Sequence, residues 1–306
     1  MIPPSTDRRI YSAELEQRTI AVAGVQRSYW MAPQPASSAP LLVILHGTGI
    51  SGAAMAGWTG LAVRGPAAGF ATVFPESVRE MWDDTGQGRA DGLDDAAFVT
   101  GLIELMISAR LVRPEAVFLV GLSNGAFFAE RLARQGKVAA LGMVLVAGTA
   151  REAARNAVPH PDRPTAVLCF GGTADPLVPY AGGRARGPLA WIARRRRRRV
   201  LTIRDRGEVV GPEVLAAEWA AVNGCSSEPT IEHLPGRPGD VAVDRLGWTA
   251  PGRPPVVLYR IEGGGHGWPG GPQYMPAAVV GRVAQRLDAT GILLSFAAEQ
   301  LDRSPA

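Results

Sequence analysis

Residues 116–128, AVFLVGLSNGAFF, decide the fold. The run at 117–120 is continuously apolar, which is typical of a strand buried on both faces of a sheet. The pentapeptide GLSNG follows at once, and a helical pattern comes directly after it. The chain must therefore turn from strand to helix within about two residues, which holds Ser123 in a strained backbone conformation above the sheet. Glycine on both arms of the turn lets them pack closely, because a Cβ there would clash.

Apolar runs and helical patterns alternate along the rest of the chain. Strands are predicted at 41–45, 70–74, 141–146, 166–170 and 256–261, helices near 95–106, 212–222 and 277–297, and hairpins at 18–32 and 230–246. This order predicts an α/β fold with a mainly parallel central sheet, helices on both faces and an antiparallel N-terminal hairpin. No repeat or linker divides the chain, so we expect a single domain over residues 1–306. Its core spans about 18–297, and a Gly/Arg-rich stretch at 181–210 is predicted to be an exposed insertion.

Composition excludes several classes of protein. Hydrophobic residues at 46% and charged residues at 20% describe a soluble globular protein, and no apolar run is long enough to span a bilayer. The net charge is +4, but without Arg194–Arg199 only 26 basic residues face 28 acidic ones, so a nucleic-acid partner is not expected. No Cys/His spacing indicates a metal site, and Cys169 lies in an apolar strand pattern typical of a buried, inert thiol.

Two further side chains could complete a catalytic group with Ser123. A serine nucleophile needs a base to take its proton and an acid to orient that base. Both are expected in loops at the carboxyl ends of later strands, the acid before the histidine in the chain. Asp175 follows the strand at 166–170 in GGTADPLVPY, and His266 follows the strand at 256–261 in GGGHGWPG. The histidines at 160 and 233 are interpreted as structural.

Two backbone amides are predicted to stabilise an oxyanion. One is the N–H of Asn124, and the other is the N–H of Thr48 in the loop after the strand at 41–45. His46, at the end of that strand, is interpreted as a loop-locking side chain rather than a catalytic one. Asp94 and Asp95 are interpreted as an N-cap and a favourable first-turn charge for the helix that follows.

The motifs together resemble one family of α/β-hydrolases, the polyhydroxybutyrate depolymerases with the related feruloyl and acetylxylan esterases. The similar stretches are RSYWMAP, LLVILHGTG, GLDDAAFV, GLSNGA, GTADPLVPY, WAAVNGC and GGGHGWPG, which together cover roughly residues 18–297. The resemblance implies an α/β-hydrolase fold, a Ser123–Asp175–His266 triad, and Trp268 beside the acyl-binding cleft. Trp82, in the irregular segment 76–92, is the second predicted substrate contact. An asparagine after the nucleophile is more similar to the feruloyl-type branch.

The chain departs from that family pattern at two places. Members similar to WAAVNGC often pair that cysteine with a second one, but Cys225 has no cysteine at the expected position. The first residues also lack a signal-peptide profile, so the sequence as given predicts a cytoplasmic protein, while the resemblance leaves a periplasmic or secreted location open. The arginine run is the second departure, and it is interpreted as a solvated charged segment.

These observations predict a serine carboxylic-ester hydrolase that acts through an acyl-enzyme on a small-molecule or polymeric ester, without cofactor or metal. A peptidase or a lactone hydrolase on the same framework is the alternative within enzymes, because fold alone does not fix the substrate. A catalytically silent binding module, or polyanion binding through Arg194–Arg199, is the alternative outside that class. Neither the natural ester nor the oligomeric state follows from the sequence.

Overall fold

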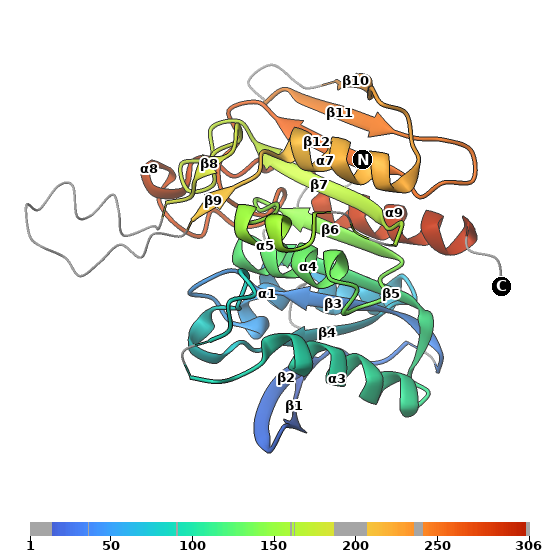
Figure 1. The fold of residues 1–306 in the computed structure, drawn as a ribbon. Coiled ribbons are helices and arrows are strands. Elements are labelled where there is room, and N and C mark those ends of the chain that lie inside the picture. The colour runs from blue at the N-terminus through green and yellow to red at the C-terminus, as the bar shows by residue number, and fades with distance from the viewer. Residues whose placement is uncertain are drawn as a thin grey trace, which may run out of the picture.

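The computed structural model describes residues 14–35, 37–89, 91–159, 161, 163–186, 207–235 and 241–303. Within these residues, one ten-stranded sheet has the order β1-β2-β4-β3-β5-β6-β7-β12-β11-β10 (Figure 1). Its strands are β1 (Glu16–Val22), β2 (Val25–Met31), β3 (Ala39–Leu45), β4 (Ala71–Pro75), β5 (Val112–Leu122), β6 (Gly142–Val146), β7 (Ala166–Gly172), β10 (Thr230–Leu234), β11 (Val243–Trp248) and β12 (Val256–Ile261). The six central strands of this order, β4-β3-β5-β6-β7-β12, are parallel to one another. The antiparallel hairpin β1-β2 lies at one edge of the sheet, and the antiparallel hairpin β10-β11 lies at the other. The predicted mixed, mainly parallel sheet is confirmed.

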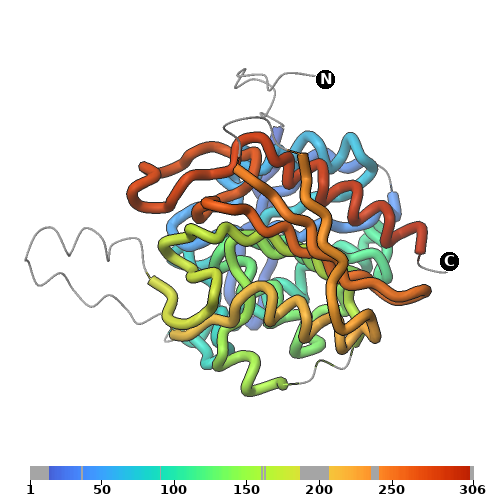
Figure 2. Tube along the Cα trace, turned by 90° about the horizontal axis from the view of Figure 1, so that it is seen from above, coloured from blue at the N-terminus to red at the C-terminus, as the bar shows by residue number. Residues whose placement is uncertain are grey.

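Helices cover both faces of this sheet, and the view from above separates the two layers (Figure 2). One layer contains α1 (Gly52–Thr59), α2 (Leu61–Ala67) and α9 (Ala289–Arg303); the other contains α3 (Asp95–Ser108), α4 (Asn124–Arg134) and α7 (Pro212–Asn223). Strand β3 shows why both layers are needed. Leu41, Val43 and Leu45 pack into one core and Leu42 and Ile44 into the other, all fully buried.

The predicted closing helix at 277–297 is wrong. The structure has a short helix α8 (Ala277–Val280), a non-helical segment, and then α9. Helix α8 ends because Gly281 adopts φ 75° and ψ −175°, a conformation that strongly favours glycine. Beyond it, Arg282 forms a parallel bridge with Gly264, so residues 281–284 run beside the loop that carries His266. A tertiary contact overrides the helical pattern here.

The predicted insertion at 181–210 is described only at its two ends, and Arg194–Arg199 lie outside the described residues. Those ends pair as β8 (Gly183–Arg184) and β9 (Glu208–Val209). They are not simply exposed, because Ala185 and Val209 are buried against Phe127 of α4. This part of the stretch therefore packs beside the turn that holds Ser123.

Four further expectations concern the two cysteines, the histidines at 160 and 233, and membrane topology. Cys169 is fully buried, and burial raises the pKa of its thiol to about 12, as expected for an inert cysteine. Cys225 is a free thiol, and its Sγ donates to the carbonyl oxygen of Pro254. His233 pairs with Asp244, whereas the predicted structural histidine at 160 lies outside the described residues. In the part of the chain that is described, no helix has the length and apolar character to cross a bilayer.

Candidate active site

Ser123 occupies the sharp turn between β5 and α4. Its backbone has φ 55° and ψ −117°, a strained conformation of the kind that costs about 1–3 kcal/mol. The turn is tight on both sides: a Cβ on Gly121 would overlap the carbonyl oxygen of Gly125, and a Cβ on Gly125 would overlap that of Leu45. The Ser123 N–H donates to Val146 of the neighbouring strand at 2.8 Å. The sequence therefore needs glycine at both positions for the hydroxyl to stand above the sheet edge.

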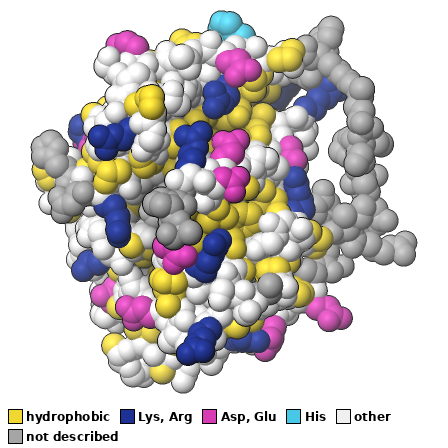
Figure 3. Space-filling view, turned by 90° about the vertical axis from the view of Figure 1, so that its right-hand side faces the viewer, with side chains coloured by type: hydrophobic (Ala, Val, Ile, Leu, Met, Phe, Trp, Pro, Cys, Tyr) yellow, Lys and Arg dark blue, Asp and Glu magenta, His cyan; other side chains and the backbone are white. Residues whose placement is uncertain are grey.

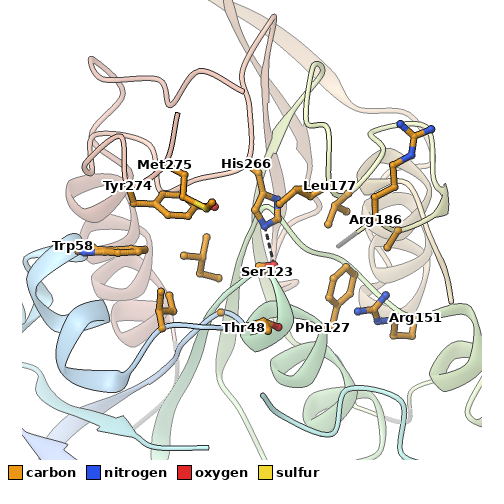
Figure 4. Close-up of a pocket in the computed structure, with 15 residues that line it drawn as sticks. Thr48, Trp58, Ser123, Phe127, Arg151, Leu177, Arg186, His266, Tyr274 and Met275 are labelled. Carbon is orange, nitrogen blue, oxygen red and sulfur yellow. Dashed lines mark hydrogen bonds between the residues drawn. The ribbon is translucent and has the colours of Figure 1, made fainter. Parts of the chain in front are cut away.

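The structure brings Ser123, Asp175 and His266 together from positions far apart in the chain. His266 Nε2 lies 2.8 Å from Ser123 Oγ (Figure 4). His266 Nδ1 lies 2.7 Å from Asp175 Oδ2. Asp175 Oδ1 accepts two backbone N–H groups, from Leu177 at 2.8 Å and from Val178 at 2.9 Å. A carboxylate held in this way accepts a hydrogen bond from the Nδ1–H group, which leaves Nε2 as the acceptor for the serine hydroxyl.

The loop that carries His266 is held by residues 280–284. Gly265 N–H donates to Arg282 at 2.7 Å, and His266 N–H donates to Val280. The two segments touch backbone to backbone, because a Cβ on Gly265 would overlap the carbonyl oxygen of Val280. Residues 280–284 are therefore positioning residues that the sequence analysis missed, since their pattern predicted a helix.

Asn124 follows the serine directly in the chain, and Thr48 lies in the loop after β3 beside the same cavity. Asn124 is the first residue of α4, where backbone N–H groups have no acceptor within the helix. Its side chain is fixed by Trp82: Oδ1 accepts from the Trp82 N–H at 2.7 Å, and Nδ2 donates to the Trp82 carbonyl at 3.2 Å. Thr48 lines the same cavity as Ser123. Both predicted amide donors thus belong to segments that border the nucleophile.

His46 fixes the loop that contains Thr48. Its ring is fully buried, Nδ1 donates to the Gly47 carbonyl at 2.9 Å, and Nε2 accepts from the Ser77 N–H at 3.1 Å. Burial lowers the pKa of this imidazole, although Glu76 nearby opposes the shift. A neutral ring with one donor and one acceptor fits both contacts. These are the loop-locking contacts expected from its position.

A cavity of about 70 Å³ opens beside Ser123 and has two unlike halves (Figure 4). One half is aromatic: Trp58 of α1 and Tyr274 pack with ring centroids 4.8 Å apart, with Met275 next to them. Burial raises the pKa of the Tyr274 hydroxyl, so the phenol stays neutral. Sequence analysis missed Trp58 and Tyr274, because neither follows a strand end nor belongs to a periodic pattern that points to a cleft.

The other half of the cavity contains Phe127 of α4 together with Leu177 and two arginines, Arg151 and Arg186. Leu177 belongs to the turn that holds Asp175. Ser123 and His266 lie between the two halves, so a bound ester would extend into both of them.

The predicted substrate contacts Trp82 and Trp268 are wrong, because both side chains are buried in the protein and neither lines this cavity. Trp82 is 1% exposed, stacks on Phe128 at 5.1 Å, and donates its indole N–H to the His46 carbonyl at 3.0 Å. Trp268 is 2% exposed and donates to Thr290 Oγ1 at 3.0 Å. Each indole has its polar and apolar partners inside the fold.

The two acids before α3 differ from each other. Asp94 is the predicted N-cap, with its side chain accepting from the Ala97 N–H at 2.9 Å. Asp95 does more than provide a first-turn charge: it is 1% exposed, pairs with Arg27 at 2.8 Å, and accepts from the Asp83 N–H at 2.9 Å. It therefore anchors the irregular segment that contains Trp82.

A larger cavity, of about 600 Å³, lies at the opposite edge of the sheet, where the parallel strands begin. It is lined by Glu115 at the start of β5, and Figure 3 shows hydrophobic side chains gathered in a hollow on this face. None of the predicted site residues lines it. Over the described residues, no cluster of histidine, cysteine, aspartate and glutamate could hold a metal ion.

Residues 27–178 match the family model for the esterase PHB depolymerase. This match covers 152 of the 306 residues and makes residues 27–178 similar to this esterase family. The chain is 29% identical over 308 residues to "Putative esterase NocK" of Nocardia uniformis subsp. tsuyamanensis, covering 96% of this chain and 85% of that protein. It is 27% identical over 178 residues to feruloyl esterase B of Piromyces equi, covering 56% of this chain and 29% of that protein.

The fold of this esterase is also similar to that of a solved structure, acetyl xylan esterase from Aspergillus awamori. The TM-score is 0.56 at 14% identity, covering 82% of this chain and 94% of that one. The α/β-hydrolase fold predicted from the sequence is confirmed, and the chain is a carboxylic ester hydrolase.

Proposed function

We propose that this esterase cleaves its substrate through an acyl-enzyme on Ser123, with His266 as general base and acid and Asp175 as the group that orients His266. The observation that carries the proposal is the continuous line of hydrogen bonds from Ser123 Oγ to His266 Nε2 and from His266 Nδ1 to Asp175 Oδ2. Nucleophile, base and orienting acid within hydrogen-bond reach are the arrangement that activates a serine.

The reaction follows from this line of contacts. His266 Nε2 takes the hydroxyl proton as Ser123 Oγ attacks the ester carbonyl carbon, and the C=O electron pair moves onto the oxygen. The tetrahedral intermediate then expels the alcohol, which receives the proton from His266 and leaves the acyl group on Ser123. A water molecule, deprotonated by His266, attacks this acyl group; the acid leaves and Ser123 recovers its proton.

The N–H groups of Asn124 and Thr48 are the proposed oxyanion donors. Asn124 N–H stands at the start of α4, where the helix dipole also favours a developing negative charge. Trp82 and His46 hold the two donor segments in place through the contacts described above. Losing one donor of this kind typically costs about 2.7–4 kcal/mol of transition-state stabilisation.

The substrate class that fits best is a small or oligomeric carboxylic ester, of the polyhydroxybutyrate or feruloyl/acetyl type. The family match and the two relatives named as esterases support an ester rather than an amide. The cavity is narrow, and its Trp58–Tyr274 wall favours a flat or short apolar group.

Labelling by a fluorophosphonate probe, together with a panel of substrates, tests this proposal. Wild type should be labelled and should release 4-nitrophenol from short-chain esters, and Ser123→Ala should do neither. The panel adds feruloyl esters, hydroxybutyrate oligomers, lactones and peptide amides. Ser108→Ala, on the exposed end of α3, is the matched control and should be labelled like wild type.

Fast amide or lactone cleavage with negligible ester turnover would reassign the substrate. Absence of labelling in a folded wild-type protein would instead indicate a silent binding module.

A further inference from the structure

The described side chains that line the cavity beside Ser123 carry positive charge but no negative charge. Among the described residues that line it, two carry a guanidinium, Arg151 and Arg186, and none carries a carboxylate. Both arginines lie in the same half, opposite the Trp58–Tyr274 wall (Figure 4). The two differ in what surrounds them, and this difference decides which of them is available to a substrate.

The positive charge of Arg151 is already balanced by a carboxylate of the protein. Its Nη2 and Nε lie 2.6 and 2.9 Å from Asp84 Oδ2, and its guanidinium packs over the Phe127 ring at 4.1 Å. The residue is only 4% exposed. A buried arginine with a carboxylate partner and an aromatic partner serves as part of the wall, because its positive charge is balanced within the protein.

Arg186 has an anchored main chain and a free side chain. Its N–H donates to the Leu177 carbonyl at 2.7 Å, in the same turn that holds Asp175. The residue is exposed and lines the cavity, and its guanidinium points away from Ser123 (Figure 4). Within the described part of the chain no acidic side chain pairs with it, whereas the half-buried arginines Arg64 and Arg260 do have acidic partners.

We propose that Arg186 gives this esterase a preference for esters that carry a second, anionic group, a carboxylate several bonds away from the scissile carbonyl. This inference rests on the proposed function, because it concerns the substrate of the same site. The carboxylate reaches the guanidinium of Arg186 while the ester lies at Ser123. Since the charge is partly exposed, the preference is modest, about fivefold at low ionic strength, and salt weakens it.

Matched substrate pairs test the preference. In the first pair the charge is on the acyl side: the mono-4-nitrophenyl ester of suberic acid and its analogue with a carboxamide in place of the carboxylate. In the second pair the charge is on the alcohol side: the butyrate ester of a hydroxy acid and that of the corresponding hydroxy amide. The measured quantity is the ratio of kcat/KM for the anionic member to that for the neutral member, with and without 0.5 M salt. The ratio cancels any general loss of activity in a variant.

For wild type we expect a ratio of about five in one pair at low salt, falling toward one at high salt. The pair that responds identifies which half of the cavity takes the acyl group. Arg186→Gln should bring the ratio close to one, and Arg186→Lys should restore most of it. Arg184→Gln, on β8 two residues earlier and outside the cavity lining, is the matched control and should keep the wild-type ratio.

A wild-type ratio near one in both pairs overturns the inference. A ratio that survives Arg186→Gln but disappears when Arg194–Arg199 are replaced by serine also overturns it, by assigning the effect to the arginine run. Failure of the proposed function is distinguishable from both results, because the neutral esters would then not be hydrolysed in a Ser123-dependent manner.

Discussion

The two sides of the candidate active site are built in different ways. The nucleophile side is one continuous stretch, in which β5, Ser123 and α4 follow each other directly. The base side is assembled from the acid turn after β7, the histidine loop after β12 and the segment 280–284. The nucleophile turn is made from adjacent residues and packs tightly, through Gly125, against Leu45 of the central strand β3. The histidine loop instead depends on contacts among segments that are far apart in the sequence. The second arrangement should be the easier one to perturb without unfolding the protein.

Contacts within the base side show how closely its segments depend on one another. The Ala174 N–H donates to Gly264 at 3.0 Å, and a Cβ on Gly172 would overlap the carbonyl oxygen of the same residue. Gln273 links the aromatic half of the cavity to the segment 280–284: its Nε2 donates to the carbonyls of Met275 and Gly281, and its Oε1 accepts from the Val283 N–H. The aromatic wall and the histidine loop thus share one support.

Asp175→Asn should give the largest effect, a fall in kcat of about 10⁴-fold, because the amide no longer stabilises the imidazolium or selects the Nδ1–H tautomer. Its remaining oxygen can still accept from the Leu177 and Val178 N–H groups, so the turn should stay in place. Ester kinetics and a thermal melt measure the two properties separately.

Asp94→Asn is the control for this substitution, since asparagine caps a helix as well as aspartate does. A variant Asp175→Asn with nearly wild-type kcat would remove this acid from the mechanism.

Gly265→Ala should lower kcat by about 10²-fold, because the new methyl group must push the His266 backbone away from Val280. Moving a catalytic group by about 1 Å can cost that factor in rate. The same change on the nucleophile side, Gly125→Ala, drives a methyl group into the central strand β3 and should abolish folding. Circular dichroism and kcat for both variants sharpen the contrast between the two sides. A folded, active Gly125→Ala protein would show that the nucleophile turn is less constrained than its contacts indicate.

Gly101→Ala is the control for both glycine variants. A Cβ there has ordinary contacts only, with the nearest atom, Val22 Cγ2, at 3.7 Å, and alanine favours the interior of α3. Its kcat should equal that of wild type.

The same contrast explains what the sequence could and could not predict. Residues 121–125 identify the nucleophile turn because both glycines stand within two residues of the serine in the sequence, and Asp175 and His266 follow directly from strand ends. The prediction of a continuous helix at 277–297 is wrong because Gly281 packs against the backbone of Gly265. A contact between residues from two separate segments leaves no sign in the local sequence pattern. The predictions that Trp82 and Trp268 contact the substrate are wrong for a related reason. The sequence near a motif is the same whether the indole faces a cavity or packs inside the protein.

The smallest expected effect concerns acid sensitivity on the nucleophile side. Burial lowers the pKa of His46, while its hydrogen bond to the Gly47 carbonyl and the nearby acids Glu76, Glu80 and Asp95 oppose the shift without overcoming it. Below about pH 6.5 the unfolded chain binds a proton on this imidazole that the folded protein does not take up. The unfolded state then binds more protons than the folded state, so the contribution of His46 to stability is lost as the pH falls.

His46→Gln removes this titration while keeping an acceptor oxygen for the Ser77 N–H. Its Tm should therefore fall less between pH 7 and pH 5 than the Tm of wild type, by a few degrees at most, even if the variant is less stable overall. An equal or larger fall in the variant would mean that protonation elsewhere in the protein controls its acid sensitivity. In that case His46, which fixes the loop that carries Thr48, would not make the nucleophile side more sensitive to acid than the base side.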